Sequence, residues 1–438
     1  MTKSIKLALV AAMAMGATSA FATNGDNLLA TGTKARGMGG VGIATSFGAE
    51  SSLANPALLS AIKKSEIAGS VTFFMPDVSF RSNVAQESQF PGSPSPDYVK
   101  SDADFNVIPE ISFAQRINDE LVYGVSLTGT AGMGVDYEDV PFGLPGDNGA
   151  FQMKTQLQLL KVAVPFSYQS GGLSVGVAPI IQHGTLKMSH RLGDGSLLKS
   201  KNSGDTSVGF EVGAAYDLKG LGAEGLTLGV VFKSRLSMEY TNTIKSSINA
   251  FGGAAQTGVA SGDNLDQPAE TGIGLSYTTG GSTIALDYRN VAWGDAEGYA
   301  DFGWEDQNIV SVGYEYATAE WAVRLGYNYA KSAIEEQNGA ANNPANYGGA
   351  VKNFFNLSGF PGIVESHITL GGSYAVNDGL TLDTAIVYSP EVTESFNTSA
   401  MTQAFIAGAG GTPSGTESSS ADVKHSQLGI TIGASYKF

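Results

Sequence analysis

Residues 37–42 read GMGGVG, so Gly37, Gly39 and Gly42 match the spacing G-x-G-x-x-G of dinucleotide-binding loops. Such loops hold a pyrophosphate against backbone amides at the start of a helix. That chemistry requires a strand before the loop and a helix after it, within a βαβ unit. The preceding residues, NGDNLLATGTKAR, have no strand pattern. We therefore expect no nucleotide cofactor, and glycine here instead allows a compact chain to lie close to another backbone.

Few other residues have the types needed for catalysis. The chain has no cysteine, and its four histidines are His183, His190, His367 and His425. None of the four stands in a recognisable Ser–His arrangement. We therefore expect neither catalytic residues nor a metal or cofactor site, and the protein is not expected to be an enzyme.

The first 22 residues predict export. Lys3 and Lys6 precede the apolar stretch LALVAAMAMGA, and Ala20-Phe21-Ala22 fits the small-x-small cleavage rule. Residues 1–22 are therefore predicted to be a signal peptide. The whole chain has a formal net charge of −16, which argues against a nucleic-acid partner because such proteins present a basic face.

Apolar and polar residues alternate in segment after segment. In the last one, Leu428, Ile430 and Ile432 alternate with Gly429 and Thr431, as in a strand with one apolar face. Fourteen such segments are predicted, at about 66–82, 105–117, 121–136, 153–169, 173–190, 205–218, 225–244, 269–279, 282–297, 306–317, 321–331, 365–376, 379–394 and 424–438.

The connections between these segments fall into two classes. INDE, QSGG, TTGG, ATAE and VNDG are tight turns, and most intervening connections are long and rich in Gly, Ser, Asn and Pro. This sorting is typical of an outer-membrane barrel. The sequence therefore predicts an all-β, 14-stranded antiparallel transmembrane β-barrel, with both barrel ends periplasmic and the long loops extracellular. A secreted β-sandwich is the alternative, but its core could not bury the inward charges.

The segment between signal and barrel lacks alternation and is rich in glycine. We divide the chain into residues 1–22 (signal peptide), 23–65 (an N-terminal plug, or hatch, in the lumen) and 66–438 (the barrel). Within the plug, Asn55-Pro56-Ala57 predicts a turn.

The plug sequence resembles the hatch of the FadL/TodX family, on GTKARGMGGVGIA followed by ESSLANPALLSAI. The blocks VIPEISFAQRINDELVYGVSLTG, DQPAETGIGLSY and GITIGASYKF extend the resemblance over nearly the whole mature chain. It implies a passive outer-membrane transporter of long-chain fatty acids or other hydrophobic small molecules. It also implies a monomer surrounded by outer-membrane lipid and lipopolysaccharide, with Gly37, Gly39, Gly42, Asn55, Pro56 and Ala57 in plug movement.

The same resemblance implies a lateral exit through a kink in the third strand. Gly129, Gly132 and Gly134 lie in the third segment, where glycine marks a bulge or bend. In the alternative interpretation, Gly132 and Gly134 already belong to the following loop.

A fatty-acid carboxylate would also need a cation in the lumen. Lys233, Arg235 and Arg324 face inward by parity, while Leu236 falls on the lipid side. We expect a bulge at Ile180-Ile181 that places Leu186 and Met188 on the lipid side and Lys187, with His183, on the lumen side. Alternatively, each cation only pairs with an inward acid such as Glu211 or Glu315.

Two questions stay open at the level of sequence. The third long loop, 191–204, is shorter than the family pattern, so an outer binding groove and the substrate are undetermined. A non-specific porin or a structural surface barrel is the competing function, although an open porin would have no plug.

Overall fold

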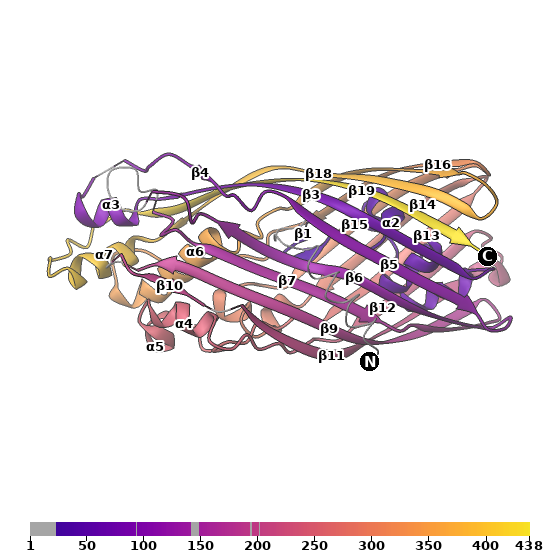
Figure 1. Ribbon diagram of the computed structural model, residues 1–438, viewed down its shortest axis with the longest axis horizontal. Helices are drawn as coiled ribbons and strands as arrows, with labels where there is room; N and C mark the ends of the chain where they lie inside the picture. Colours follow the sequence, from indigo (N-terminus) through magenta and orange to yellow (C-terminus); the bar gives the residue numbers. More distant parts are fainter. Residues whose placement is uncertain (1–22, 93, 142–148, 193–194, 201) are drawn as a thin grey trace.

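The computed structural model describes residues 23–438 except 93, 142–148, 193–194 and 201 (Figure 1). The predicted signal peptide therefore lies outside the described residues. Fifteen strand segments form a wall of fourteen strands, because β7 and β8 are two parts of one strand interrupted at Val164-Pro165. These segments are β3 (Glu66–Ser82), β5 (Asn106–Arg116), β6 (Leu121–Asp136), β7 (Lys154–Ala163), β8 (Phe166–Ser170), β9 (Leu173–Arg191), β11 (Ser203–Asp217), β12 (Leu226–Lys233), β13 (Glu270–Thr279), β14 (Ser282–Val291), β15 (Gln307–Ala317), β16 (Trp321–Ala330), β17 (Ser366–Ala375), β18 (Leu380–Asn397) and β19 (Ser420–Lys437).

The wall closes where the last strand meets the first. β19 pairs with β3 antiparallel from Lys437↔Glu66 to Ala421↔Ser82. Closure removes the sheet edges that lipid cannot hydrogen-bond. The predicted 14-stranded barrel is confirmed, but two predicted segments run too far: the one expected at 225–244 leaves the regular ladder after Lys233, and the one expected at 282–297 leaves it after Val291.

Side chains in the middle of the wall alternate as predicted. On the outside, Ile273 is 59% exposed and Ile284 is 56% exposed. On the inside, Glu211, Asp287 and Asp383 are buried. Apolar residues therefore face lipid and charged residues face the lumen, as expected for a membrane barrel.

The long loops lie together at one end of the barrel. The helices of these loops gather at the end of the barrel opposite the C-terminus (Figure 1). The loop elements are α3 (Val84–Gln89), β4 (Val99–Lys100), β10 (Leu197–Lys199), α4 (Ile244–Asn249), α5 (Gly253–Thr257), η4 (Trp293–Asp295), η5 (Ala300–Phe302), η6 (Pro344–Asn346), α6 (Tyr347–Gly359) and α7 (Ser399–Gly408). At the opposite end, η3 (Leu218–Leu221) lies in a short connection. Among the described residues, no helix is long and apolar enough to cross a membrane.

An apolar cluster fills the lumen at the loop end. Phe354 and Phe355 of α6 are fully buried, and they share this cluster with Leu186 and Met188 of β9. The expectation that Leu186 and Met188 face lipid is therefore wrong. No bulge occurs at Ile180-Ile181, because β9 pairs with β7 and β11 there without a register shift.

Residues 23–65 form an irregular segment that is almost entirely buried against the inside of the wall. It contains β1 (Thr23–Asn24), β2 (Asn27–Leu28), α2 (Thr33–Gly37), η1 (Gly48–Leu53) and η2 (Pro56–Ala61). We call it the plug.

Glycines allow the backbones of plug and wall to touch. Gly39 has φ +73°, and a Cβ at this position would lie 2.7 Å from the Val312 carbonyl oxygen and 2.8 Å from the Tyr327 nitrogen. A Cβ on Gly37 would lie 2.7 Å from Cα of Gly371. Side chains at these contacts would push the plug off the wall.

We expect Gly39→Leu to displace the plug without unfolding the barrel. A non-glycine residue at positive φ costs on the order of 1–3 kcal/mol, and the added side chain also overlaps the backbones of β15 and β16. Heat-modifiable electrophoretic migration should stay normal, whereas ion conductance in planar bilayers should rise. Gly220→Leu is the control, because a Cβ there meets nothing within 4 Å. Unchanged conductance in Gly39→Leu would show that this contact does not hold the plug.

Candidate functional site

An ion pair anchors the plug to the wall. The guanidinium of Arg36 donates to both carboxylate oxygens of Glu110, at 2.8 and 2.7 Å. Glu110 also accepts from the plug backbone at Gly32 (3.2 Å) and from the hydroxyls of Ser70 (3.0 Å) and Thr128 (2.9 Å). Both charged side chains are buried, so their mutual pairing and hydrogen bonds must replace water.

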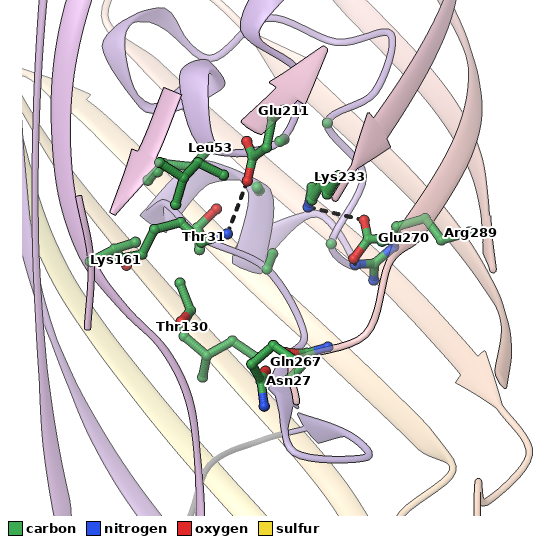
Figure 2. A pocket seen from close by; sticks show the side chains of 18 of the residues that line it. Asn27, Thr31, Leu53, Thr130, Lys161, Glu211, Lys233, Gln267, Glu270 and Arg289 are labelled. Carbon is green, nitrogen blue, oxygen red and sulfur yellow. Dashed lines mark hydrogen bonds and ion pairs between the residues drawn. The ribbon is translucent and has the colours of Figure 1, made fainter. Parts of the chain in front are cut away.

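A pocket lies between the plug and the wall on the β6–β14 side of the lumen. The volume of this pocket is about 90 Å³. Its lining combines plug residues, such as Asn27 and Leu53, with wall residues from β6, β7, β9, β11, β12, β13 and β14 (Figure 2).

Opposite charges face each other across this pocket. Lys161 contacts Glu211 at 2.9 Å and Lys233 contacts Glu270 at 3.0 Å (Figure 2). Arg289 lies 3.8 Å from Glu270. The second carboxylate oxygen of Glu211 has no hydrogen-bond partner among the described residues. The pocket can therefore offer a ligand both ammonium donors and carboxylate acceptors next to apolar plug side chains.

A carboxylate of the wall also holds the plug backbone beside the pocket. Oδ2 of Asp287 accepts from the backbone nitrogens of Gly42 (2.7 Å) and Ile43 (2.9 Å). Irregular backbone inside a barrel needs such partners because it has no ladder of its own.

Of the five residues proposed to bind a ligand head group, one lines the pocket. Lys233 does so, whereas Arg324 is inward but pairs with Glu315 at 2.6 Å and donates to Ser373. Lys161 also lines the pocket, although it is not among the residues predicted from the sequence, where it stands between apolar neighbours in QLQLLKVAV. Because both faces of that strand carry apolar residues, the sequence does not show which face points into the lumen.

The other three candidates, His183, Lys187 and Arg235, were predicted to face the lumen, and the structure contradicts this prediction. His183 and Lys187 lie on the outer side of β9, because strict alternation puts Gln182, Leu186 and Met188 inside. Arg235 is 42% exposed by side chain and pairs with Asp266 at 3.0 Å, since the chain changes parity after Lys233. The same change places Leu236, expected on the lipid side, in the pocket lining.

The Asn55-Pro56-Ala57 turn lies against the wall. The Asn55 side chain accepts from the nitrogen of Ala57 at 3.0 Å and donates to the Ile43 carbonyl at 2.8 Å. It also lies 3.3 Å from the Ala214 and Val230 carbonyl oxygens of the wall.

The tripeptide occurs a second time in a loop. Asn343-Pro344-Ala345 has the same cap, with Asn343 accepting from Ala345 at 3.0 Å. The motif itself is therefore a local turn, and its position in the plug gives it the additional contacts.

The wall is interrupted beside the glycines of β6. The β5–β6 ladder ends at Glu110↔Thr128, next to Pro109, which has no N–H to donate. The β6–β7 register shifts between Gly129 and Ala131, and β6 then continues to Asp136. Gly132 and Gly134 are therefore strand residues and not part of the loop.

Plug residues partly occupy this interruption, which we call the β5–β6 gap. Asn27 bridges to Ala131, and the Gly132 nitrogen donates to the Asp26 carbonyl at 3.3 Å. Asp136 closes the gap at the loop end by bonds to Asp102 and Ser101.

The start of the plug inserts into an aromatic cluster of the loops. Trp293, Tyr299 and Trp304 have ring centroids 4.7–5.2 Å apart. A Cβ on Gly25 would lie 2.8 Å from Trp293. The neighbouring Asp26 carboxylate is fully buried and accepts from the Tyr299 hydroxyl and from Gln267. Burial raises the pKa of Asp26 to about 6.

Among the described residues, no group of His, Asp or Glu side chains could hold a metal ion. A family model described as outer membrane protein transport protein (OMPP1/FadL/TodX) matches residues 8–346. A comparison with curated proteins gave no match.

Solved structures share this fold at low sequence identity. A Pseudomonas aeruginosa FadL homologue is 16% identical, with a TM-score of 0.67 over 94% of this chain and 100% of that chain. The P. putida toluene transporter TodX is 16% identical, with a TM-score of 0.62 over 94% and 99%. The Ralstonia pickettii toluene transporter TbuX is 15% identical, with a TM-score of 0.58 over 94% and 99%.

We expect the contact of the plug with the aromatic cluster to weaken as pH rises. The pKa of Asp26 is raised from 3.8 to about 6, so the folded state favours the proton. The contact is strongest below about pH 4 and weakens as pH rises through about 6. Trp293 and Trp304 supply two of the three tryptophans, so their fluorescence in a Trp321→Phe background should change with a midpoint near pH 6.

Asp26→Asn should remove that transition, and Asp378→Asn in a distant turn should keep it. A transition that persists in Asp26→Asn would assign it to another group.

Proposed function

Because the chain belongs to the OMPP1/FadL/TodX family of outer membrane transport proteins, we propose that it carries long-chain fatty acids or related apolar compounds passively across the outer membrane. The observation that carries this proposal is the pocket between plug and wall, which adjoins the β5–β6 gap through Thr128 and Thr130. The structural relatives TodX and TbuX are described as toluene transporters, so an aromatic hydrocarbon is the competing substrate.

In the proposed path, a hydrophobic molecule enters from the loop end and reaches the pocket. Rearrangement of residues 23–28 then frees the β5–β6 gap, and the molecule leaves sideways into the membrane. The short turns face the periplasm and the long loops face outward in this arrangement. No catalytic residue is needed, because each step is binding or diffusion.

A non-specific porin is disfavoured by the plug. Its backbone is held by Glu110 and Asp287 and by direct contact of Gly37 and Gly39 with the wall. An open pore would require all of these contacts to break. Function as a monomer is proposed only as what the family resemblance implies.

Lys233→Met should weaken oleate binding about tenfold and leave toluene binding unchanged. A hydrogen bond to a charged group contributes about 1.5–3 kcal/mol, and about 1.4 kcal/mol is tenfold in affinity. Binding to purified protein and uptake by cells with and without the protein are the measurements. Lys233→Arg should restore oleate binding, and Lys219→Met in an exposed turn is the neutral control. A protein that conducts ions freely and binds neither compound contradicts the proposal.

Asn55→Ala should slow uptake, because the lost bond to the Ile43 carbonyl displaces a plug residue that lines the pocket and so weakens ligand binding. The cap and the Ile43 contact are both lost, at a cost of about 0.5–2 kcal/mol for the cap. The matched control is Asn343→Ala, which removes the same cap from the exposed loop. Initial uptake rates should fall in Asn55→Ala only. Equal rates in both variants would remove this turn from the gating mechanism.

A further inference from the structure

The wall contains a second interruption, between β11 and the chain that follows β12. The β11–β12 ladder ends at Glu211↔Lys233, and beyond it Ser234 and Phe210 are joined by two hydrogen bonds: the Ser234 nitrogen donates to the Phe210 carbonyl at 3.0 Å, and the Phe210 nitrogen donates to Oγ of Ser234 at 3.0 Å. β11 continues to Ser203 while paired only on its other edge, with β9. Within the described ranges, no backbone hydrogen bond joins residues 203–209 to residues 235–240. We call this the β11–β12 gap.

The gap is closed at its far end by a side chain. The Glu239 nitrogen donates to Oδ2 of Asp205 at 2.8 Å. The chain after β12 keeps its bridges to the opposite neighbour, Leu236↔Gln267 and Glu239↔Asn264. The interruption therefore has a bottom at Ser234–Phe210 and a top at Glu239–Asp205.

The two gaps are built in the same way. In the β5–β6 gap, a Cβ on Gly129 would lie 3.0 Å from the side chain of Ile108. In the β11–β12 gap, a Cβ on Gly209 would overlap the side chain of Leu236. Each gap thus has glycine on one edge, and one aliphatic side chain from the other edge packs on it.

The outer side of the β11–β12 gap faces an apolar surface. Val208 on its edge is 73% exposed, the highest value among the large apolar residues of the described chain. Phe210 (46%) and Ile181 (54%) lie beside it on the outside. Unpaired backbone next to lipid is unfavourable, so an interruption here needs a reason other than stability.

The inner side of the same gap opens on the pocket. Glu211, Lys233, Ser234 and Leu236, at the base of the gap, all line it. Thr128 and Thr130 bring the β5–β6 gap to the same pocket. The panel between the gaps consists of β6, β7, β9 and β11, which remain paired with one another.

We propose that the β11–β12 gap is a second lateral portal, through which an apolar molecule passes between the pocket and the membrane lipid. Leu236 is its gate: rotation of this side chain off Gly209 joins the pocket to the lipid beside Val208. The cargo is a molecule with an acyl chain or another slender apolar body, because Ser234 and Leu236 border the passage. This inference rests on the proposed function, since it names another route from the same pocket.

A cross-link across the gap tests the portal. The chain has no cysteine, so Gly209→Cys with Leu236→Cys can be oxidised selectively, and its formation checked by mass spectrometry. Oxidation should cause a loss of labelled oleate uptake that a reductant reverses. Leu286→Cys with Val312→Cys, a directly paired couple on β14 and β15, should transport equally well oxidised and reduced.

A second variant keeps the test decisive where the cross-link does not form. Leu236→Ala removes the side chain that covers Gly209, so oleate uptake should rise above that of the unmodified protein. Unchanged uptake in Leu236→Ala, or in the oxidised cross-linked protein, overturns the portal.

The two hypotheses fail differently. If the unmodified, correctly folded protein binds and transports no hydrophobic probe, the proposed function fails. If it transports oleate and a cross-link between Ile108→Cys and Gly129→Cys abolishes uptake while the β11–β12 cross-link does not, only the second portal fails.

Discussion

The buried pair of Arg36 and Glu110 connects the parts of this molecule that matter for transport. Glu110 is the last residue of β5 paired with β6, and it receives the plug through Arg36 and Gly32. The same carboxylate accepts from β3 and β6 through Ser70 and Thr128. Removing either charge would leave the other buried without a counterion, which is strongly unfavourable. The plug position, the wall and the base of the β5–β6 gap therefore depend on one another.

Around this anchor, the lumen provides an irregular chain with the hydrogen bonds that a sheet would otherwise supply. Asp287 and Thr369 accept from plug amides, at Gly42 and Gly39 respectively. Glycine on both surfaces brings the backbones into contact, as between Gly37 and Gly371. This arrangement explains why a largely irregular segment can be almost entirely buried.

The inner surface changes character along the barrel axis. Around the plug it is charged, with Glu211, Lys233 and Glu270 facing the pocket. At the loop end it is apolar, with Leu186 and Met188 packed among the aromatic residues of α6. A hydrophobic molecule entering from the loops would thus meet apolar surface first and charge later. Two interruptions of the wall begin where the charged zone begins.

The amino-acid sequence alone determined the barrel, its strand count and the plug, because alternation and turn length are local patterns set by which face meets lipid. The family resemblance of the N-terminal segment, with its glycine-rich stretch followed by Asn-Pro-Ala, was also recognisable from the sequence. Only the tertiary structure decided which candidate residues share the pocket: His183 and Lys187 lie on the outer side of β9, and Arg235 lies beyond the end of β12, where the chain changes parity.

The alternation of residues along a strand predicts which side of the wall a side chain faces only where the outer surface meets lipid and the ladder is regular. Beyond Ile181 the apolar residues turn inward to pack under the loops, and after Lys233 the ladder is broken. Both effects depend on contacts between residues far apart in the chain, so no local pattern contains them.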